Sequence, residues 1–109
     1  MFLDAAAAVI SPEKLRDYLL STTHPIGRYK STFFRSLGYM QDQWQVLERD
    51  LRAILLNEAH IAGSTEYGQK FTVRGVLSGP NGRAAAILSF WIILTAERAP
   101  RFVTAYPEV

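Results

Sequence analysis

Apolar residues recur at helical spacing in the first half of the chain and at alternating spacing in the second half. The clearest helical pattern runs from about Gln41 to Ala59, where one helix face carries a stripe of mostly large apolar side chains. The members of this stripe are Trp44, Leu47, Leu51, Ile54, Leu55 and Glu58. We expect Asp42 to cap this helix. The opposite face, with Glu48 and Arg52 as an i,i+4 pair, is expected to be solvated surface.

Two shorter helices are predicted before it. Ser11 and Pro12 favour a helix start, because serine caps helix N-termini and proline fits the first turn. We expect this helix to end near residues 21–23. A second helix is predicted from about Tyr29 to Ser36, and it should stop at Gly38, which suits the left-handed position after a helix.

Past Gly63 the apolar period changes from helical to alternating. The apolar members of the alternating segment are Phe71, Val73 and Leu77. This pattern predicts a strand with one wet face, in which Gly75 marks a bulge or a close backbone approach. Residues 79–82, Gly-Pro-Asn-Gly, predict a tight hairpin connection.

The last part of the chain predicts two more strands. The segment from Ala84 to Thr95 is apolar on both alternating sets, which is typical of a central strand. A final strand is expected from Arg101 to Tyr106, ended by Pro107. The pattern therefore predicts an α+β fold with three N-terminal helices packed on a C-terminal three-stranded antiparallel β-meander. We expect one domain over residues 1–109, because the only candidate linker, residues 62–66, is too short to divide it.

Composition narrows the chemistry. The chain is 49% hydrophobic and 20% charged, as in ordinary globular proteins, and it has no cysteine. Its two histidines, His24 and His60, lie far apart in the sequence without metal-ligand spacing, so neither a metal nor another cofactor is expected. The apolar run at residues 5–10 follows Asp4, has no positively charged segment before it and is too short for a secretory signal. The apolar run at residues 84–96 is too short to span a bilayer. We therefore expect a soluble cytoplasmic protein that does not interact with membranes.

The formal net charge of +2 is modest, but the cations are grouped. The segments 24–41 and 67–96 each contain three Lys or Arg residues and no acid. These cations are Arg28, Lys30, Arg35, Lys70, Arg74 and Arg83. If the two segments meet in space, they form one basic face suited to a phosphate-bearing ligand.

Candidate chemistry is concentrated in the segment from His24 to Lys30, where a Pro/Gly loop opens a helix. His24 is a proton-transfer candidate, and a simpler interpretation makes it a helix-capping residue. Candidate catalytic residues are His24, Lys30 and Tyr106. Candidate phosphate-binding residues are Arg28, Lys70, Arg74 and Thr104. The simpler interpretations are solubilising charges for Lys70 and Arg74, and a ring buried at the sheet end for Tyr106.

Two segments carry a resemblance to a known family. HPIGRYKSTFFRSLGY (His24 to Tyr39) and RFVTAYP (Arg101 to Pro107) resemble a family of small uncharacterised bacterial domains found alone or at the ends of polymorphic-toxin proteins. The late Thr-x-Tyr-Pro strand and the helices-then-meander order are similar to barnase-like, EndoU-like, colicin-type and RelE-like ribonuclease toxins. That resemblance implies a site formed by His24, Lys30, Thr104 and Tyr106. The chain departs from this group by lacking a second histidine or a glutamate base in the predicted sheet.

Three functional hypotheses follow. The first is a metal-independent ribonuclease of toxin type, acting on RNA and restrained by a small immunity or antitoxin-like protein. The second is a non-enzymatic interaction module whose exposed sheet edge pairs with a partner or with a second copy of the chain. The third is a binder of a small anionic ligand at the loop from His24 to Lys30. Cations gathered around one cleft favour the first hypothesis, and scattered cations favour the second.

Overall fold

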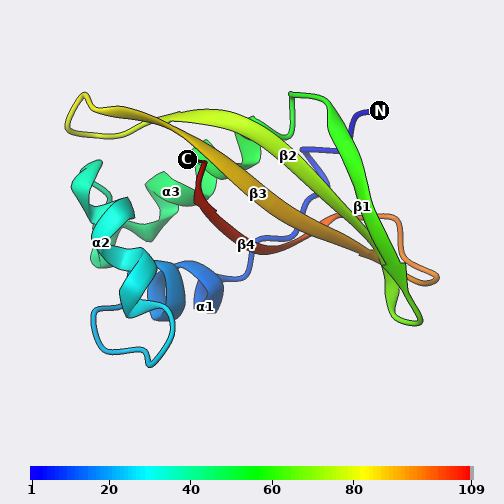
Figure 1. Cartoon of the computed structure of the whole chain (residues 1–109), viewed down its shortest axis with the longest axis horizontal. Helices are drawn as coiled ribbons and strands as arrows, with labels where there is room; N and C mark the ends of the chain where they lie inside the picture. The colour runs from blue at the N-terminus through cyan, green and yellow to red at the C-terminus, as the bar shows by residue number, and fades with distance from the viewer. Residues whose placement is uncertain (109) are drawn as a thin grey trace.

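The computed structural model describes residues 1–108 as a helical layer packed against one antiparallel sheet (Figure 1). The helical elements are α1 (Pro12–Lys14), the π-helical η1 (Leu15–Leu19), α2 (Arg28–Ser36), the 3-10 turn η2 (Gln41–Gln43) and α3 (Trp44–Ile54). The strands are β1 (Ala59–Thr65), β2 (Gly68–Ser78), β3 (Ala84–Leu94) and β4 (Arg101–Pro107). The sheet order is β1-β2-β3-β4, with antiparallel pairing throughout.

The sheet has four strands, so the prediction of a three-stranded meander is wrong. The additional strand is β1, which occupies residues assigned to the end of the third helix and to a linker. Only Ala59 is buried in β1, so this edge strand has no apolar alternation for a sequence pattern to detect. α3 ends at Ile54, and Asn57, three residues later, donates its side-chain amide to the Arg74 carbonyl on β2 (2.9 Å). Helix and strand are therefore joined by a short turn.

β1 also relocates His60, which the helix prediction placed at a helix end. His60 lies on the edge strand directly opposite Thr72 of β2. The expectation that the sheet contains no second histidine is therefore wrong. His60 shares the outer face with Thr72, Phe90 and Thr104, because these residues are paired across successive strands.

The helical elements lie near their predicted positions, but two of the three predicted capping residues have other roles. Ser11 is at the N-cap of α1, but its hydroxyl contacts the Glu13 carboxylate and makes no capping bond. Gly38 follows α2 with φ +95°, as its predicted role requires. Asp42 lies within the 3-10 turn η2 and does not cap α3, so that prediction is wrong.

The core lies between the helices and the inner face of the sheet. Its largest fully buried side chains include Trp91, Phe34, Leu15, Leu47, Leu51 and Ile87. Ser89 lies among them and is fully buried: its hydroxyl donates to the Val73 carbonyl (2.7 Å) and accepts the indole N–H of Trp91 (2.9 Å). Both residues come from β3, which is the predicted central strand, paired with β2 on one side and β4 on the other.

Close approaches fix the helical layer on the sheet. A Cβ on Gly75 of β2 would lie 2.9 Å from the side chain of Ile54, so the predicted close approach is confirmed. The β2–β3 register runs past Gly75 without interruption. The hairpin at residues 79–82 is also confirmed, and its Asn81 side chain donates to the Ser36 carbonyl at the end of α2 (2.9 Å).

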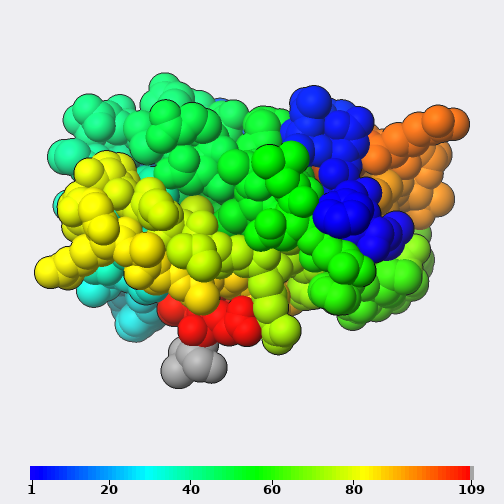
Figure 2. All heavy atoms as spheres, turned by 90° about the horizontal axis from the view of Figure 1, so that it is seen from above, coloured from blue at the N-terminus to red at the C-terminus, as the bar shows by residue number. Residues whose placement is uncertain are grey.

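The N-terminal segment runs between the two edges of the sheet. Met1 accepts a backbone hydrogen bond from Ala59 of β1, and Val9 forms a parallel bridge with Arg101 of β4. Figure 2 shows this segment, in blue, against β1. Arg52 holds it by donating to the carbonyls of Ala5 (2.9 Å) and Ala8 (2.7 Å). Arg52 also forms the expected ion pair with Glu48. Its contacts with the N-terminal segment show that this helix face is not simply solvated surface, as was predicted.

Candidate functional site

A cavity of about 180 Å³ opens on the outer face of the sheet, toward its β4 edge. It is lined by Lys70, Phe90, Trp91, Val103, Thr104 and Tyr106. The β3–β4 register shifts here, because Trp91 pairs with Phe102 whereas Phe90 pairs with Thr104. The extra residue is Val103, and such bulges locally twist a strand and redirect its side chains.

Lys30 reaches this cavity from helix α2. Its ammonium donates to the Thr104 hydroxyl (Nζ to Oγ1, 2.7 Å), which joins residues 74 positions apart. The same ammonium lies over the rings of Tyr18 (5.2 Å) and Tyr106 (5.4 Å). Two aromatic faces and one hydroxyl therefore hold the Lys30 charge beside the cavity.

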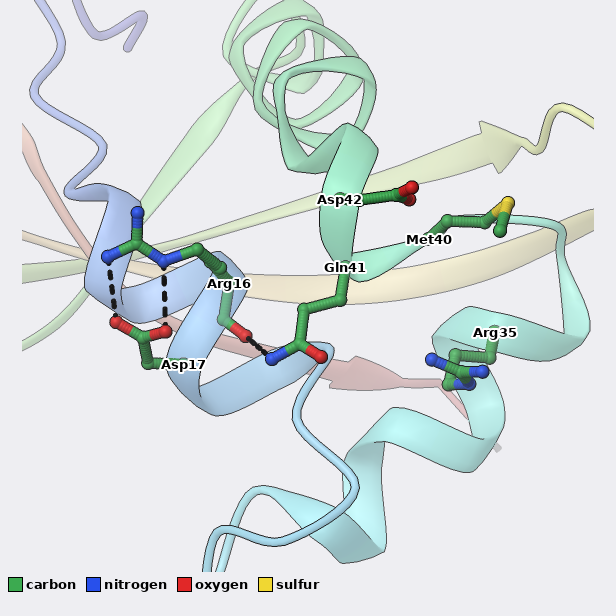
Figure 3. Close-up of a pocket in the computed structure, with 6 residues that line it drawn as sticks. All are labelled: Arg16, Asp17, Arg35, Met40, Gln41 and Asp42. Carbon is green, nitrogen blue, oxygen red and sulfur yellow. Dashed lines mark hydrogen bonds and ion pairs between the residues drawn. The ribbon is translucent and has the colours of Figure 1, made fainter.

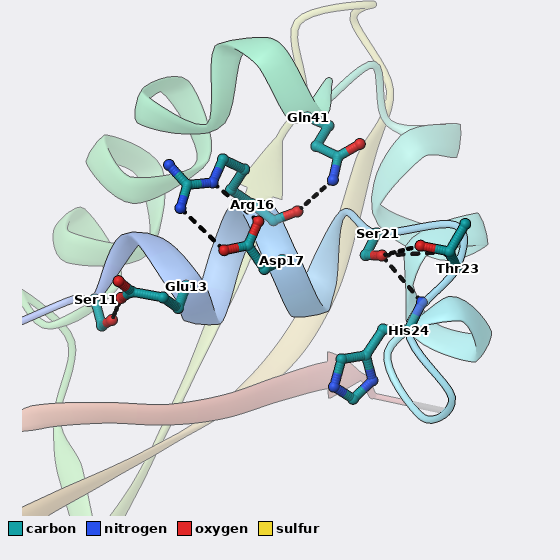
Figure 4. A network of polar contacts seen from close by, with 8 residues as sticks. All are labelled: Ser11, Glu13, Arg16, Asp17, Ser21, Thr23, His24 and Gln41. Carbon is teal, nitrogen blue, oxygen red and sulfur yellow. Dashed lines mark hydrogen bonds and ion pairs between the residues drawn. The ribbon is translucent and has the colours of Figure 1, made fainter.

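The loop before α2 sets the position of Lys30. The Ser21 hydroxyl accepts the backbone N–H groups of Thr23 (3.2 Å) and His24 (3.0 Å), and Figure 4 shows these three residues grouped at the loop. Gly27 packs so closely on η1 that a Cβ there would overlap the backbone of Tyr18. The loop and the helix η1 thus form one unit that presents both Tyr18 and Lys30.

His24 has a structural role that restricts its chemistry. Its Nδ1 accepts the backbone N–H groups of Ile26 (3.0 Å) and Gly27 (2.9 Å) at the start of α2. A neutral ring that accepts at Nδ1 carries its proton on Nε2, so His24 presents an N–H donor at that atom and not a base. The ring stacks edge-on against Tyr18, with centroids 5.0 Å apart. The Tyr18 ring therefore contacts both His24 and the Lys30 ammonium.

Tyr106 stands at the mouth of the cavity. Its side chain is 40% exposed, so it is not buried at the sheet end as the simpler interpretation holds. Its ring lies 5.1 Å from that of Phe90 at an angle of 36°. The two rings form an aromatic wall beside the Lys30 ammonium.

The structure brings some predicted site residues together and separates others. Lys30, Lys70, Thr104 and Tyr106 meet at the cavity, so one cation from each acid-free segment reaches the same place. Arg74 is paired with Glu108 (2.9 Å) and is not part of the cavity lining.

Arg28 also lies outside the cavity. Its guanidinium contacts the neighbouring Tyr29, with a hydrogen bond of 2.8 Å to the hydroxyl. Of the predicted phosphate-binding cations, Arg28 and Arg74 therefore do not line the cavity.

Two site residues were missed from the sequence. The segment from Ala84 to Thr95 is apolar on both alternating sets, which does not single out Phe90, but its neighbours Ser89 and Trp91 are both buried on the inner face, and strict alternation places Phe90 on the outer face. Tyr18 falls beside the buried Leu19, and its contact with Lys30 depends on the packing of α2 against η1. A sequence signal existed for Phe90 and not for Tyr18.

A larger but shallower depression, of about 450 Å³, lies between η1, η2 and the end of α2 (Figure 3). Arg16 and Asp17 form two hydrogen bonds of 2.9 Å there, which hold the pKa of the Asp17 carboxyl below its usual range. Gln41 donates to the Arg16 carbonyl (2.7 Å), and Arg35 and Asp42 add opposite charges to the rim. This depression has mixed charge and polar groups that bind one another, so the smaller cavity is the better candidate site.

The described part of the chain offers neither a metal-binding cluster nor a membrane-spanning helix. Residues 1–108 contain no group of three His, Asp or Glu side chains placed to hold a metal ion. Within the same range, no helix combines the length and apolar character needed to cross a membrane.

Comparisons with known proteins place the chain in a family. Residues 2–109 match the model of a family described as Domain of unknown function (DUF6883). The chain belongs to the DUF6883 family. The expected membership in a family of small uncharacterised domains is therefore confirmed. No curated protein matches this DUF6883 chain.

Among solved structures, the DUF6883 chain is similar to a chain of the contact-dependent growth inhibition toxin and immunity protein complex from Klebsiella pneumoniae 342. The TM-score is 0.73 at 22% sequence identity, and the match covers 92% of this chain and 99% of that chain. The two chains therefore share a fold over nearly their whole lengths.

Proposed function

We propose that this DUF6883 protein is a metal-independent ribonuclease of toxin type that cleaves RNA phosphodiesters at the outer-face cavity. The observation that carries the proposal is the contact between Lys30 and Thr104, which places a fixed ammonium and a hydroxyl at the mouth of a pocket. Such a pair suits a phosphodiester, because the ammonium offsets phosphate charge and the hydroxyl can donate to a phosphoryl oxygen.

The reaction class is attack of a ribose 2′-hydroxyl on the adjacent phosphorus. The O2′–P bond forms, the P–O5′ bond breaks, and the proton of the 2′-hydroxyl is transferred to the departing 5′-oxygen. Tyr106 is assigned this proton transfer, because its hydroxyl both donates and accepts and its ring adjoins the Lys30 ammonium. Lys30 stabilises the negative charge that grows on phosphorus. His24 contributes the Nε2–H donor and the cap that positions α2.

The toxin assignment draws on the structural neighbour, a chain of a complex between a contact-dependent growth inhibition toxin and its immunity protein. A cavity that carries Lys30 and Lys70 suits the nuclease member of such a pair better than the inhibitor, because RNA is a polyanion. We infer that a small immunity protein with acidic side chains covers this cavity, since complementary charge favours such a complex.

Cleavage of RNA by the purified protein in EDTA tests the proposal. Lys30→Ala should lower the rate by about 100-fold or more, because it removes the cation beside the reacting phosphate. Lys14→Ala is the matched control, since Lys14 is an exposed lysine on α1 and the charge change is the same. Equal rates for the two folded variants, or loss of wild-type cleavage in EDTA, would contradict the proposal.

His24→Asn separates the two roles of His24. Asparagine is a good helix-capping residue but has no imidazole N–H, so the variant keeps a cap at α2. A rate loss of about tenfold or more with unchanged thermal stability supports a role in the chemistry. Full activity in the variant assigns His24 to positioning alone.

A second candidate function is a non-enzymatic interaction module, and the exposed edge strand β1 favours it. The residues of β1 after Ala59 are exposed, including Ile61 at 63%. Such an edge can pair with a partner strand or with a second copy of the chain. This function is supported if the folded wild-type protein cleaves no RNA in a broad panel. The wild-type protein should then associate with a partner or with a second copy of the chain, and the Ile61→Lys variant should lose that association.

A further inference from the structure

The outer-face cavity has the dimensions of a single flat ring. A cavity of about 150 Å³ with apolar walls holds one benzene molecule, and this cavity measures about 180 Å³. Two of its lining residues, Phe90 and Tyr106, carry aromatic rings that stand 5.1 Å apart, and Tyr106 is 40% exposed to solvent. Aromatic side chains at such openings bind nucleic-acid bases by stacking.

The polar groups of the cavity favour a ligand that accepts hydrogen bonds. Lys70 has an ammonium, which donates and cannot accept. The Thr104 hydroxyl already accepts a hydrogen bond from Lys30, which leaves its own proton to be donated. A base with carbonyl oxygens on a single ring matches these donors, whereas adenine is bicyclic and exposes an amino group.

Thr104 belongs to both parts of the site. It lines the cavity, and it also contacts the Lys30 ammonium that we assign to the phosphate. A nucleotide with its phosphate at Lys30 therefore has its base within reach of Phe90 and Lys70.

We propose that the outer-face cavity is a base subsite for a pyrimidine, with uracil preferred because it offers two carbonyl oxygens. The base stacks against the aromatic wall of Phe90 and Tyr106, and Lys70 donates to a carbonyl oxygen. The RNA context of this subsite rests on the proposed ribonuclease function, but nucleotide binding can be measured without turnover.

Binding of uridine 3′-phosphate, adenosine 3′-phosphate and inorganic phosphate to the intact protein provides the test. Backbone amide NMR signals report it, because Val103 and Thr104 line the cavity and Trp44 lies on α3 as an internal reference. Uridine 3′-phosphate should bind about tenfold more tightly than the other two probes and should shift the Val103 and Thr104 signals but not that of Trp44.

Lys70→Met should abolish this preference, because it keeps the side-chain stem and removes the donor. Lys14→Met is the matched control and should bind as wild type does. Phe90→Leu provides a second variant, which removes the stacking surface but keeps an apolar side chain in the wall.

The outcomes separate this inference from the ribonuclease proposal. Equal binding of the two nucleotides, or a preference retained in Lys70→Met, overturns the base subsite, even if the protein cleaves RNA. A uridine preference that depends on Lys70 and Phe90 supports the subsite, even if no RNA is cleaved, in which case the ribonuclease proposal fails alone. Cleavage 3′ to pyrimidines that becomes unselective in Lys70→Met supports both.

Discussion

Ser89 connects two strands and a tryptophan inside the core. It is fully buried, donates to Val73 and accepts from Trp91. Ser89→Ala should lower the free energy of unfolding by about 1–3 kcal/mol, because it leaves the Trp91 indole N–H buried without an acceptor. Urea unfolding measures this loss, with Ser78→Ala at the exposed end of β2 as the control. A loss in Ser89→Ala no larger than in the control would contradict this role.

Gly27 determines how closely the α2 loop approaches η1. Its φ of −60° is ordinary for any residue, so backbone strain does not require glycine there. A Cβ would instead overlap the Tyr18 backbone and push the loop away. Gly27→Ala should therefore lower the free energy of unfolding by about 1–3 kcal/mol and reduce Lys30-dependent activity. Thermal unfolding and RNA cleavage check the two effects, and wild-type values in both would refute the packing argument.

The sequence predicts the site residues by chemical type better than it predicts their contacts. Lys30, Lys70, Thr104 and Tyr106 were selected as cations or hydroxyl groups in acid-free or terminal segments, and they meet at one cavity. Arg28 and Arg74 satisfied the same criterion, but they contact Tyr29 and Glu108. Only the folded chain determines which charges face the cavity, because the choice depends on contacts between residues distant in sequence.

At the scale of elements, Arg52 ties helix α3 to the N-terminal segment. Its guanidinium donates to two carbonyls of that segment and pairs with Glu48. Arg52→Ala should lower the free energy of unfolding by about 1–3 kcal/mol and speed amide exchange at Val9. Hydrogen exchange followed by NMR measures this effect. Arg49→Ala is the control, because Arg49 lies on the same helix and is largely exposed. Equal exchange rates of the Val9 amide in the two variants would show that Arg52 does not hold the N-terminal segment.

The elements that could be predicted are those with a strong apolar period. The α3 stripe, the alternation in β2 and the apolar β3 all bury one face or both, so their patterns are visible in the sequence. β1 could not be found in this way, because it is held by backbone pairing with β2 and buries only Ala59. The same reasoning explains why the third helix was predicted to extend to Ala59, whereas α3 ends at Ile54. The last residues of its apolar stripe lie in the turn that leads to β1.

At the scale of the whole molecule, one buried tyrosine makes stability depend on alkaline pH. Burial raises the pKa of the Tyr39 hydroxyl well above its usual range, and the hydrogen bond to Asp50 (2.6 Å) raises it further. A group whose pKa is higher in the folded state contributes stability below its unfolded pKa of about 10, and this contribution is lost as pH rises further. The folded protein should therefore lose stability above about pH 10.

Unfolding in urea between pH 8 and pH 11 measures this dependence. Tyr39→Phe should be less stable at pH 8 by about 1 kcal/mol, since it lacks the hydrogen bond, but its stability should fall less steeply above pH 10. The comparison between the two proteins removes the contribution of lysine titration, which both share. Parallel curves would show that Tyr39 is not the group responsible.

The hydrogen bond between Lys30 and Thr104 joins the helical half of the molecule to its last strand, across 74 positions. No fragment that lacks either region contains the site. During synthesis on a ribosome, the chain remains without the candidate site until β4 has joined the sheet. Two separately produced halves, divided in the turn before β1, should likewise be inactive alone. They should gain a site only when they reassemble, so activity that appears after mixing would measure the assembly of the fold.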